Sequence, residues 1–285
     1  MIKILDEATI AQIAAGEVIE RPVSVVKELV ENSLDAHATS IQVELVDGGR
    51  EAIVVTDDGD GISRDQLPAA FARHATSKLA SADDLFSIAT LGFRGEGLAS
   101  IAAAARVEML SRTNADDIGA RIEASGTEVG HPRSAAAAIG TRVVVRDLFW
   151  ATPARRAFLK TGRAEFSRIA SFLSQLSLGW PHISFALRHD GKDVWRLPAA
   201  ADPVDRIETV FGKGTRGQLV RIDDSLERGR ERVTGYIGLP GHDRANRNAQ
   251  VFFVNGRLVR SAALGAAWLA GYGSFGMTGR YPMGV

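Results

Sequence analysis

Three polar side chains recur along one side of a helix expected near the N-terminus. Glu28 and Asn32 are four residues apart, and Asp35 lies seven residues after Glu28. In a helix this spacing places all three on one polar stripe. The carboxylate of Glu28 could accept a proton from an attacking water, and the amide oxygen of Asn32 could ligate Mg²⁺. Because such a stripe is also typical of the solvated side of a helix, it does not decide the function by itself.

An acidic, glycine-bearing loop follows a predicted strand. It contains Asp57, Gly59 and Gly61 in the pattern Asp-x-Gly-x-Gly. The glycines let the backbone approach a ligand closely, and the Asp57 carboxylate could accept a hydrogen bond from an adenine amino group. An ordinary turn or an acidic calcium loop would use similar residues. The EF-hand is excluded because its spacing, with a distant bidentate Glu, does not match.

Two further segments, residues 73–78 and 92–98, carry groups suited to phosphate. The first supplies two hydroxyls and a charge, from Thr76, Ser77 and Lys78. Residues 92–98 place glycines ahead of a predicted helix, whose free N–H groups and dipole attract anions. Neither a Walker A motif nor the dinucleotide fingerprint is present. The candidate phosphate-binding residues are Thr76, Ser77, Lys78, Gly92, Phe93, Arg94, Gly95, Glu96, Gly97 and Leu98.

A fourth motif, Gly140 and Thr141, opens a later strand and could bring a hydroxyl near Asp57. Glycine loops and strand starts are, however, often only structural.

The elements that position these residues follow from hydrophobic periodicity and turn signals. Pro22 suits the first turn of a helix that runs to about Ala36, and a hairpin of strands 41–46 and 52–56 follows. A helix ahead of a hairpin argues against a parallel βαβ repeat. We also expect helices at 10–19, 66–75, 98–105 and 165–179, and strands at 107–111, 120–124, 141–147, 184–189 and 192–197.

A linker at 198–203 separates a second region. It is expected to hold helices at 204–211 and 261–270, with strands at 219–222, 232–239 and 250–254. We therefore predict a first domain over residues 1–200 and a second, smaller α+β domain over 204–285. Because the glycine-rich stretch from 271 closes no visible unit, we expect the second domain to be truncated at its C-terminal end.

Composition limits the class of protein. Hydrophobic residues make up 45% of the 285 residues and charged residues 24%, as in soluble globular proteins. The lack of cysteine excludes disulfides, thiol catalysis and thiolate metal sites. Without a signal peptide or a membrane-length apolar run, the sequence predicts a cytoplasmic protein with no membrane partner.

Charge is divided unevenly along the chain. Residues 1–100 hold 8 Lys and Arg against 17 Asp and Glu, a net charge of −9, and the remainder carries +9. The acidic part suits a divalent cation, and the basic part suits a polyanion such as DNA. Chance segregation on solvated faces would give the same numbers, so this asymmetry favours DNA only weakly.

Taken in their order along the chain, the helix stripe, the acidic loop, the glycine segment and the Gly-Thr pair resemble the motifs of the GHKL ATPases. These include type II topoisomerase ATPase domains, ninety-kilodalton heat-shock chaperones, histidine kinases and MutL. Within that group the chain resembles the MutL family of DNA mismatch repair proteins. A topoisomerase ATPase domain lacks the strings at 92–98 and 254–257, and a histidine kinase would need a preceding phosphoacceptor helix. The matching strings are residues 12–22, 26–36, 73–78, 92–98, 147–149, 152–156 and 254–257.

This resemblance implies a fold and a set of roles. The fold is α+β: a GHKL (Bergerat) α/β sandwich with a mixed, mainly antiparallel sheet, followed by a smaller domain of ribosomal protein S5-like type. Glu28, rather than Glu31, would activate water. Asn32 would ligate Mg²⁺, Asp57 would bind adenine with support from Thr141, and the candidate phosphate-binding residues, together with Gly61, would complete the ATP site.

The resemblance also implies a slow ATPase switch in mismatch repair. ATP would favour self-dimerisation, and partners would include a mismatch-recognition protein of the MutS type, a downstream helicase or nuclease, and DNA bound through its phosphates. The protein would be cytoplasmic and associate with the nucleoid on DNA. A non-catalytic, nucleotide-gated scaffold is the alternative. The candidate DNA contacts are Arg257 first, then Arg155, Arg156, Lys160 and Arg163.

The chain departs from the family pattern at several positions. His37 stands where the family usually has Gly, Asp58 where it has Asn, and Gly97 where it has Ala. We expect His37 to lie on the surface at a helix end, and the charge of Asp58 to weaken nucleotide binding slightly. A family lysine that reaches the γ-phosphate lies beyond the last residue, so hydrolysis by this stretch of chain is expected to be impaired.

Overall fold

The computed structural model describes residues 6, 12, 13, 15, 16, 18–72, 75, 91, 92, 95–225, 231–276 and 279–285. Contacts divide the chain into two compact units. The first unit comprises residues 1–172 and 183–199, and the second comprises 173–182 and 200–285. Residues 173–182 thus group with the second unit although they lie, in sequence, within the first predicted domain.

A mixed sheet forms the first unit. Its strand order is β5-β4-β3-β7-β2-β1-β8-β9, with β6 paired to β4. Among the strand pairs that the structure describes in this sheet, β1 and β8 are parallel and the other pairs are antiparallel. The strands are β1 (Ser40–Val46), β2 (Ala52–Asp57), β3 (Arg106–Arg112), β4 (Gly119–Ser125), β5 (Glu128–Val129), β6 (Arg133–Ala135), β7 (Gly140–Arg146), β8 (Ser184–His189) and β9 (Lys192–Leu197).

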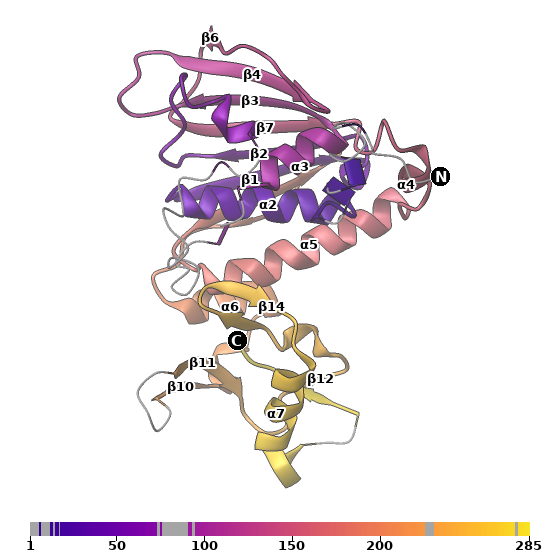
Figure 1. Cartoon of the computed structure of the whole chain (residues 1–285). Coiled ribbons are helices and arrows are strands. Elements are labelled where there is room, and N and C mark those ends of the chain that lie inside the picture. The colour runs from indigo at the N-terminus through magenta and orange to yellow at the C-terminus, as the bar shows by residue number, and fades with distance from the viewer. Residues whose placement is uncertain are drawn as a thin grey trace. The chain divides into compact units, whose positions relative to one another are not determined.

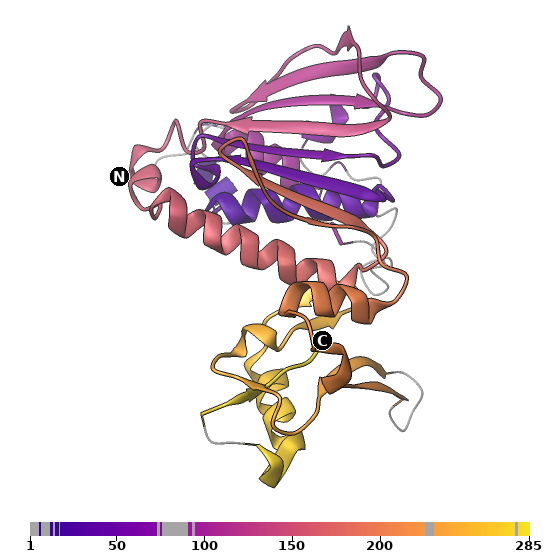
Figure 2. The ribbon, with the colours of Figure 1, turned by 180° about the vertical axis from the view of Figure 1, so that it is seen from behind.

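Helices α2 and α3 cover one face of this sheet (Figure 1), and the view from behind shows the strands in front of them (Figure 2). Alternation along the strands explains the arrangement, because one side of β1 buries Ile41, Val43 and Leu45 against the helices. The helical segments are α2 (Pro22–Asp35), η1 (Asp47–Gly49), η2 (Ala69–Phe71), α3 (Gly97–Ala104), α4 (Pro153–Ala157) and α5 (Gly162–Gly179), which continues into the second unit.

The second unit combines short strand pairs with two longer helices. Strands β10 and β11, β12 and β15, and β13 and β14 form three antiparallel pairs. Leu178, Ile207, Val251 and Met283 pack together in its core. The elements are α6 (Pro203–Phe211), η4 (Arg216–Gln218), β10 (Leu219–Ser225), β11 (Arg232–Gly238), β12 (Asp243–Arg244), η5 (Arg247–Ala249), β13 (Phe252–Val254), β14 (Arg257–Val259), α7 (Ala262–Tyr272), η6 (Gly273–Phe275) and β15 (Tyr281–Pro282).

Most sequence-predicted elements in the described part of the chain are present, and one is wrong; part of the helix predicted over 10–19 lies outside the described residues. Strands β8 and β9 match the prediction to the residue, and α2 begins at Pro22 as expected. The helix predicted over 66–75 is replaced, in its described part, by turns and the short η2 segment. The turn already begins at Ser63, whose carbonyl oxygen accepts a hydrogen bond from the N–H of Leu67 at 3.2 Å, and Pro68 lacks the N–H that would continue this turn as a helix. No helix in the described part of the chain is long and apolar enough to cross a membrane.

Candidate functional site

The polar stripe predicted on α2 is present. Glu28, Asn32 and Asp35 are half-buried, whereas Val26 and Val30 on the opposite side are buried in the core. The helix therefore turns its apolar side toward the sheet and keeps this stripe accessible at the margin of the unit. A half-buried stripe can contact a ligand that lies between α2 and a neighbouring segment, whereas a fully solvated stripe would have no such neighbour.

The glycine segment lies beside this stripe. The Asp35 carboxylate accepts hydrogen bonds from the backbone N–H groups of Leu91 and Gly92, each at 2.8 Å. At the other end, a Cβ on Gly97 would lie 2.7 Å from Oε2 of Glu28, so the carboxylate of Glu28 packs against the first residue of α3. Both ends of the segment are thus held against α2.

The two segments with candidate phosphate-binding groups meet at a glycine. Gly95 has φ +62°, and a Cβ there would lie 2.6 Å from the carbonyl oxygen of Ala75. This position therefore needs glycine both for its left-handed backbone and for space. The contact brings residue 95 next to the residue that precedes Thr76. Thr76, Ser77, Lys78, Phe93 and Arg94 lie outside the described residues.

Asp57 lies at the end of β2 and is tied to two other elements. Its carboxylate accepts hydrogen bonds from the Ser33 hydroxyl of α2 at 2.7 Å, from the backbone N–H of Gly59 at 3.0 Å and from that of Thr141 in β7 at 3.2 Å. Burial raises the pKa of Asp57, and the three hydrogen bonds only partly offset this effect. The Asp57 carboxylate thus lies directly against α2, one residue beyond Asn32.

The backbone of the acidic loop is shaped by close contacts. Gly61 has φ +72°, and a Cβ on this residue would overlap the carbonyl oxygen of Arg112 at the end of β3. A Cβ on Gly59 would lie 2.5 Å from the carbonyl oxygen of Ala36. The two glycines of the Asp-x-Gly-x-Gly pattern therefore let the loop pass between α2 and β3, as the pattern predicts.

Serines that the sequence analysis did not single out complete this network. Ser111 accepts a hydrogen bond from the N–H of Ile62 at 2.8 Å, and its hydroxyl lies 2.9 Å from that of Thr141. Ser33 is buried and 24 residues from Asp57. No local spacing signals such contacts, because they depend on how the strands and α2 come together.

The departures from the family pattern have clear local structures. His37 is exposed with φ +57°, a backbone conformation that favours the glycine usual in the family. Asp58 accepts hydrogen bonds from the N–H groups of Thr39 and Ser40 at 2.8 and 2.7 Å. Although burial raises it, a hydrogen bond from the Thr39 hydroxyl at 2.6 Å and these two backbone hydrogen bonds hold the pKa of Asp58 below its ordinary value. Its carboxylate is thus engaged with the start of β1.

The candidate DNA contacts occupy different environments. Arg155 is turned toward the N-terminal segment, where its guanidinium lies 3.4 Å from the Gln12 carbonyl oxygen and fills the space that a side chain on Gly16 would need. Arg156 and Lys160 are exposed. In the second unit, Arg257 is half-buried in β14, and Arg163 is exposed at the start of α5 in the first unit.

Comparison with known proteins places this geometry in a family. Residues 20–128 match the model of the histidine kinase-, DNA gyrase B- and HSP90-like ATPases, and residues 207–285 match that of the DNA mismatch repair protein C-terminal domain. The MutL mismatch repair proteins of Halothermothrix orenii and Lactobacillus acidophilus are 42% and 44% identical over 99% and 98% of this chain. The chain spans 44% of the length of each of these two relatives.

Solved structures agree with this relationship. The N-terminal domain of a DNA repair protein has a TM-score of 0.81 at 27% identity, covering 96% of this chain and 84% of that one. The MutL ATPase domain of Aquifex aeolicus complexed with ADP has a TM-score of 0.65 at 28% identity, covering 89% and 88%. With its α+β architecture and mostly antiparallel sheet, the chain has the GHKL ATPase fold, and it belongs to the MutL family of DNA mismatch repair proteins.

Proposed function

We propose that the first unit binds Mg–ATP along α2 and hydrolyses it slowly, as a conformational switch in DNA mismatch repair. The observation that carries this proposal is the double contact of α2. Through Glu28 and Asp35 it touches the glycine segment, and through Ser33 it touches Asp57. One helix thus connects an acceptor suited to adenine with backbone donors suited to phosphate.

Asp57 would bind the adenine. A carboxylate that is half-buried and fixed by three hydrogen bonds can accept a further one from an amino group without reorganising. Thr141 supports it directly through its backbone N–H. Gly61 supports the site indirectly, because it shapes the loop around the carboxylate. The ADP complex of the Aquifex aeolicus relative agrees with nucleotide binding by this fold.

Residues 92–98 would hold the phosphates, with Thr76, Ser77 and Lys78. Gly97 begins α3, an eight-residue helix whose N-terminal N–H groups favour an anion. The Asp35 contacts fix the start of the segment, so its N–H groups need little ordering when a phosphate arrives. We assign specificity for the triphosphate to these backbone groups and the Lys78 charge.

Asn32 would hold Mg²⁺, and Glu28 would accept the proton of the attacking water. The residues fit Mg²⁺ because Asn32 offers an amide oxygen on the half-buried stripe beside the phosphate segment, and Mg²⁺ takes further ligands from phosphates and water. When bound, the ion supplies positive charge that offsets the phosphate oxygens. Glu28 lies one helical turn before Asn32, against Gly97, where its carboxylate can orient a water toward the phosphate segment.

Partners follow from the family and from charge. ATP binding would favour self-dimerisation and signal from a mismatch-recognition protein to a helicase or nuclease. DNA contact would rest on phosphates, with Arg257, Arg156 and Lys160 as candidates. Arg155 would contribute less, because it already contacts the N-terminal segment. Such binding should be largely independent of sequence and weaken with salt.

Calorimetry with a non-hydrolysable ATP analogue and Mg²⁺ tests the proposal. The wild-type chain should bind the analogue, and Asn32→Ala should abolish measurable binding because the metal loses its amide ligand. The matched control is Gln42→Ala, which deletes an amide in β1, outside the site, and should bind the analogue normally. Equal binding by Asn32→Ala and wild type would refute the assignment. Single-turnover assays then separate an ATPase from a non-catalytic, nucleotide-gated scaffold.

A further inference from the structure

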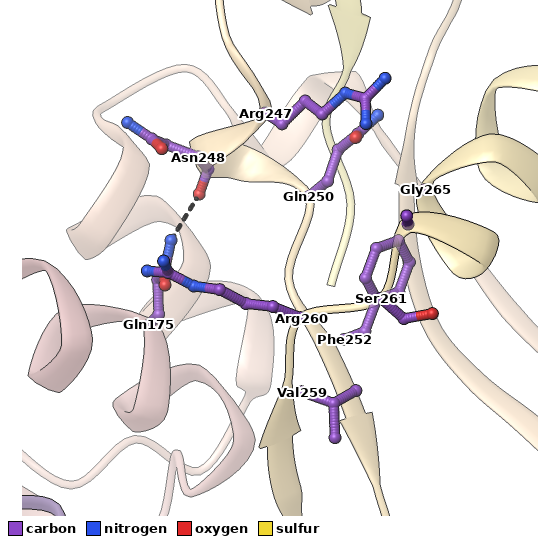
Figure 3. A pocket seen from close by; sticks show the side chains of 10 residues that line it. Gln175, Arg247, Asn248, Gln250, Phe252, Val259, Arg260, Ser261 and Gly265 are labelled. Carbon is purple, nitrogen blue, oxygen red and sulfur yellow. Dashed lines mark hydrogen bonds between the residues drawn. The ribbon is translucent and has the colours of Figure 1, made fainter. Parts of the chain in front are cut away.

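The second unit contains a pocket of its own. It encloses about 320 Å³ between the end of α5, the η5 segment, the β13–β14 hairpin and the start of α7. This volume is in the range of small-molecule sites. Figure 3 shows the side chains that surround it, with Arg247 and Gln250 on one side and Arg260 and Gln175 on the other. Every lining residue belongs to the second unit.

The charge of this pocket is positive. Arg247 and Arg260 line it, and no acidic side chain is among its described lining residues. Neither arginine forms an ion pair with any residue that the structure describes. Arg247 stacks over the ring of Tyr281 at 5.2 Å, which fixes its side chain without neutralising it. Two uncompensated guanidinium groups in one cavity favour an anion, and their planar donors suit phosphate.

The start of α7 adds backbone donors. Ser261 is the N-cap, and its hydroxyl accepts a hydrogen bond from the N–H of Leu264 at 3.2 Å. Ser261, Ala262 and Gly265 all line the pocket, so the N-terminal end of this eleven-residue helix opens into it. Its dipole adds to the arginine charges.

A buried acceptor indicates that the ligand is more than a bare phosphate. Gln250 donates from Nε2 to the carbonyl oxygen of Pro282 at 3.1 Å, and its buried Oε1 has no hydrogen-bond partner among the described residues. A buried acceptor without a partner is costly, and a ligand N–H or O–H would satisfy it. The floor includes Phe252 and Val259, whose apolar surfaces suit a sugar or a base.

We propose that this pocket binds a free phosphate ester about the size of one nucleotide. The phosphate lies between Arg247, Arg260 and the start of α7, and the attached group donates a hydrogen bond to Gln250. This site goes beyond the ATP switch proposed above, because it uses no residue of the first unit and requires no hydrolysis.

Binding of thymidine 5′-monophosphate and of a short labelled DNA duplex tests the proposal, by calorimetry and fluorescence anisotropy respectively. Thymidine monophosphate is chosen because it lacks the adenine amino group that Asp57 is proposed to recognise. Arg247→Gln and Arg260→Gln should each weaken binding of the monophosphate by about tenfold, the usual loss for a charge-assisted hydrogen bond. Asn32→Ala should leave it unchanged, so failure of this site is distinguishable from failure of the ATP site.

Two variants separate the pocket from general positive charge. Gly265→Leu keeps both arginines but fills the cavity; a Cβ there meets only Nη1 of Arg247, at 3.7 Å, so the first atom of the added side chain has room. It should weaken binding as much as the arginine variants. Arg221→Gln removes an exposed arginine of the same unit outside the pocket and should change affinity by no more than about twofold. Thermal melting checks that each variant is folded.

The DNA measurement separates a site for a free ligand from the DNA contact proposed above. If the pocket takes a backbone phosphate, Gly265→Leu weakens the duplex as well, and Arg247→Gln lowers the salt dependence by about one phosphate contact. If it takes a free nucleotide, only the monophosphate is affected. The second result supports the proposal, and the first would overturn it, because the pocket would then be part of the DNA contact already proposed. The proposal is overturned if neither probe binds more weakly to Gly265→Leu or to the arginine variants than to Arg221→Gln.

Discussion

The site of the first unit and the pocket of the second unit organise their polar groups in opposite ways. In the first unit, Asp57 and Asp35 are held by three and two hydrogen bonds. In the second, Arg247 and Arg260 have no acidic partner among the described residues. A site fixed by the backbone is preorganised for one ligand, whereas side-chain charges without an acidic partner tolerate ligands of different shape.

The difference has a consequence for mutation. Substitutions in the first-unit site should change catalysis, specificity or the stability of the fold, because its groups are part of the packing. Substitutions in the second-unit pocket should change affinity alone. The following predictions test the first half of this comparison, and the pocket variants described above test the second.

Replacement of Glu28 by Gln should have the largest effect. Loss of the carboxylate that accepts the proton should lower the rate of ATP hydrolysis by about 10²- to 10⁴-fold while the analogue still binds. The measurement is phosphate release under single-turnover conditions. Glu31→Gln is the matched control on the same helix, and it should keep most of the hydrolysis rate. Normal turnover by Glu28→Gln would show that another group is the base.

Gly61→Ala should destabilise the first unit by about 3 kcal/mol, since it combines a left-handed backbone with overlap of the Arg112 carbonyl oxygen. Gly126→Ala is the matched control, because Gly126 has φ +64° but no atom within 4 Å of the added Cβ. It should cost only about 1 kcal/mol from the backbone. Urea unfolding measures both, and equal losses would mean that the Arg112 contact can relax.

Asp57→Asn should weaken ATP binding by about tenfold through loss of the charged acceptor, yet leave stability within about 1 kcal/mol of wild type. Because burial raises the pKa of Asp57 above 3.8, the folded state binds the proton more tightly than the unfolded chain does. Its contribution to stability is therefore present below pH 3.8 and falls as pH rises through the folded-state pKa. Unfolding at pH 4 and pH 7 should show the variant gaining relative to wild type at the higher pH.

His37→Gly should have the smallest effect, a gain of about 1 kcal/mol. Glycine relieves the left-handed φ of +57°, and the exposed contact between His37 and Asp60 contributes little. A rise in the thermal midpoint at unchanged ATP affinity would place this residue outside the site. A fall would mean that the contact with Asp60 outweighs the strain.

The sequence predicted elements well where periodicity and turn residues agree. Asp190 and Gly191 mark the turn between β8 and β9, and Pro22 marks the start of α2. Over residues 66–75 the apolar residues favour a helix, but Pro68 prevents the turn that begins at Ser63 from continuing as one. The short β5 and β6 strands were missed because two or three residues carry no period.

The candidate site was predictable only in part. Gly59 and Gly61 carry a local pattern, and the structure shows the close contacts which that pattern implies. Ser33 carries none, because its role depends on Asp57, 24 residues away. The orientation of Arg155 was equally hidden, because a basic run indicates charge but not which guanidinium is engaged by Gln12. Contacts between distant segments follow from packing rather than from spacing.

The most direct test of the central claim is a crystal structure of the chain with a non-hydrolysable ATP analogue and Mg²⁺. Our account predicts adenine hydrogen-bonded to Asp57, triphosphate against residues 92–98, and the metal on Asn32. An analogue bound away from α2, or only in the pocket of the second unit, would contradict it.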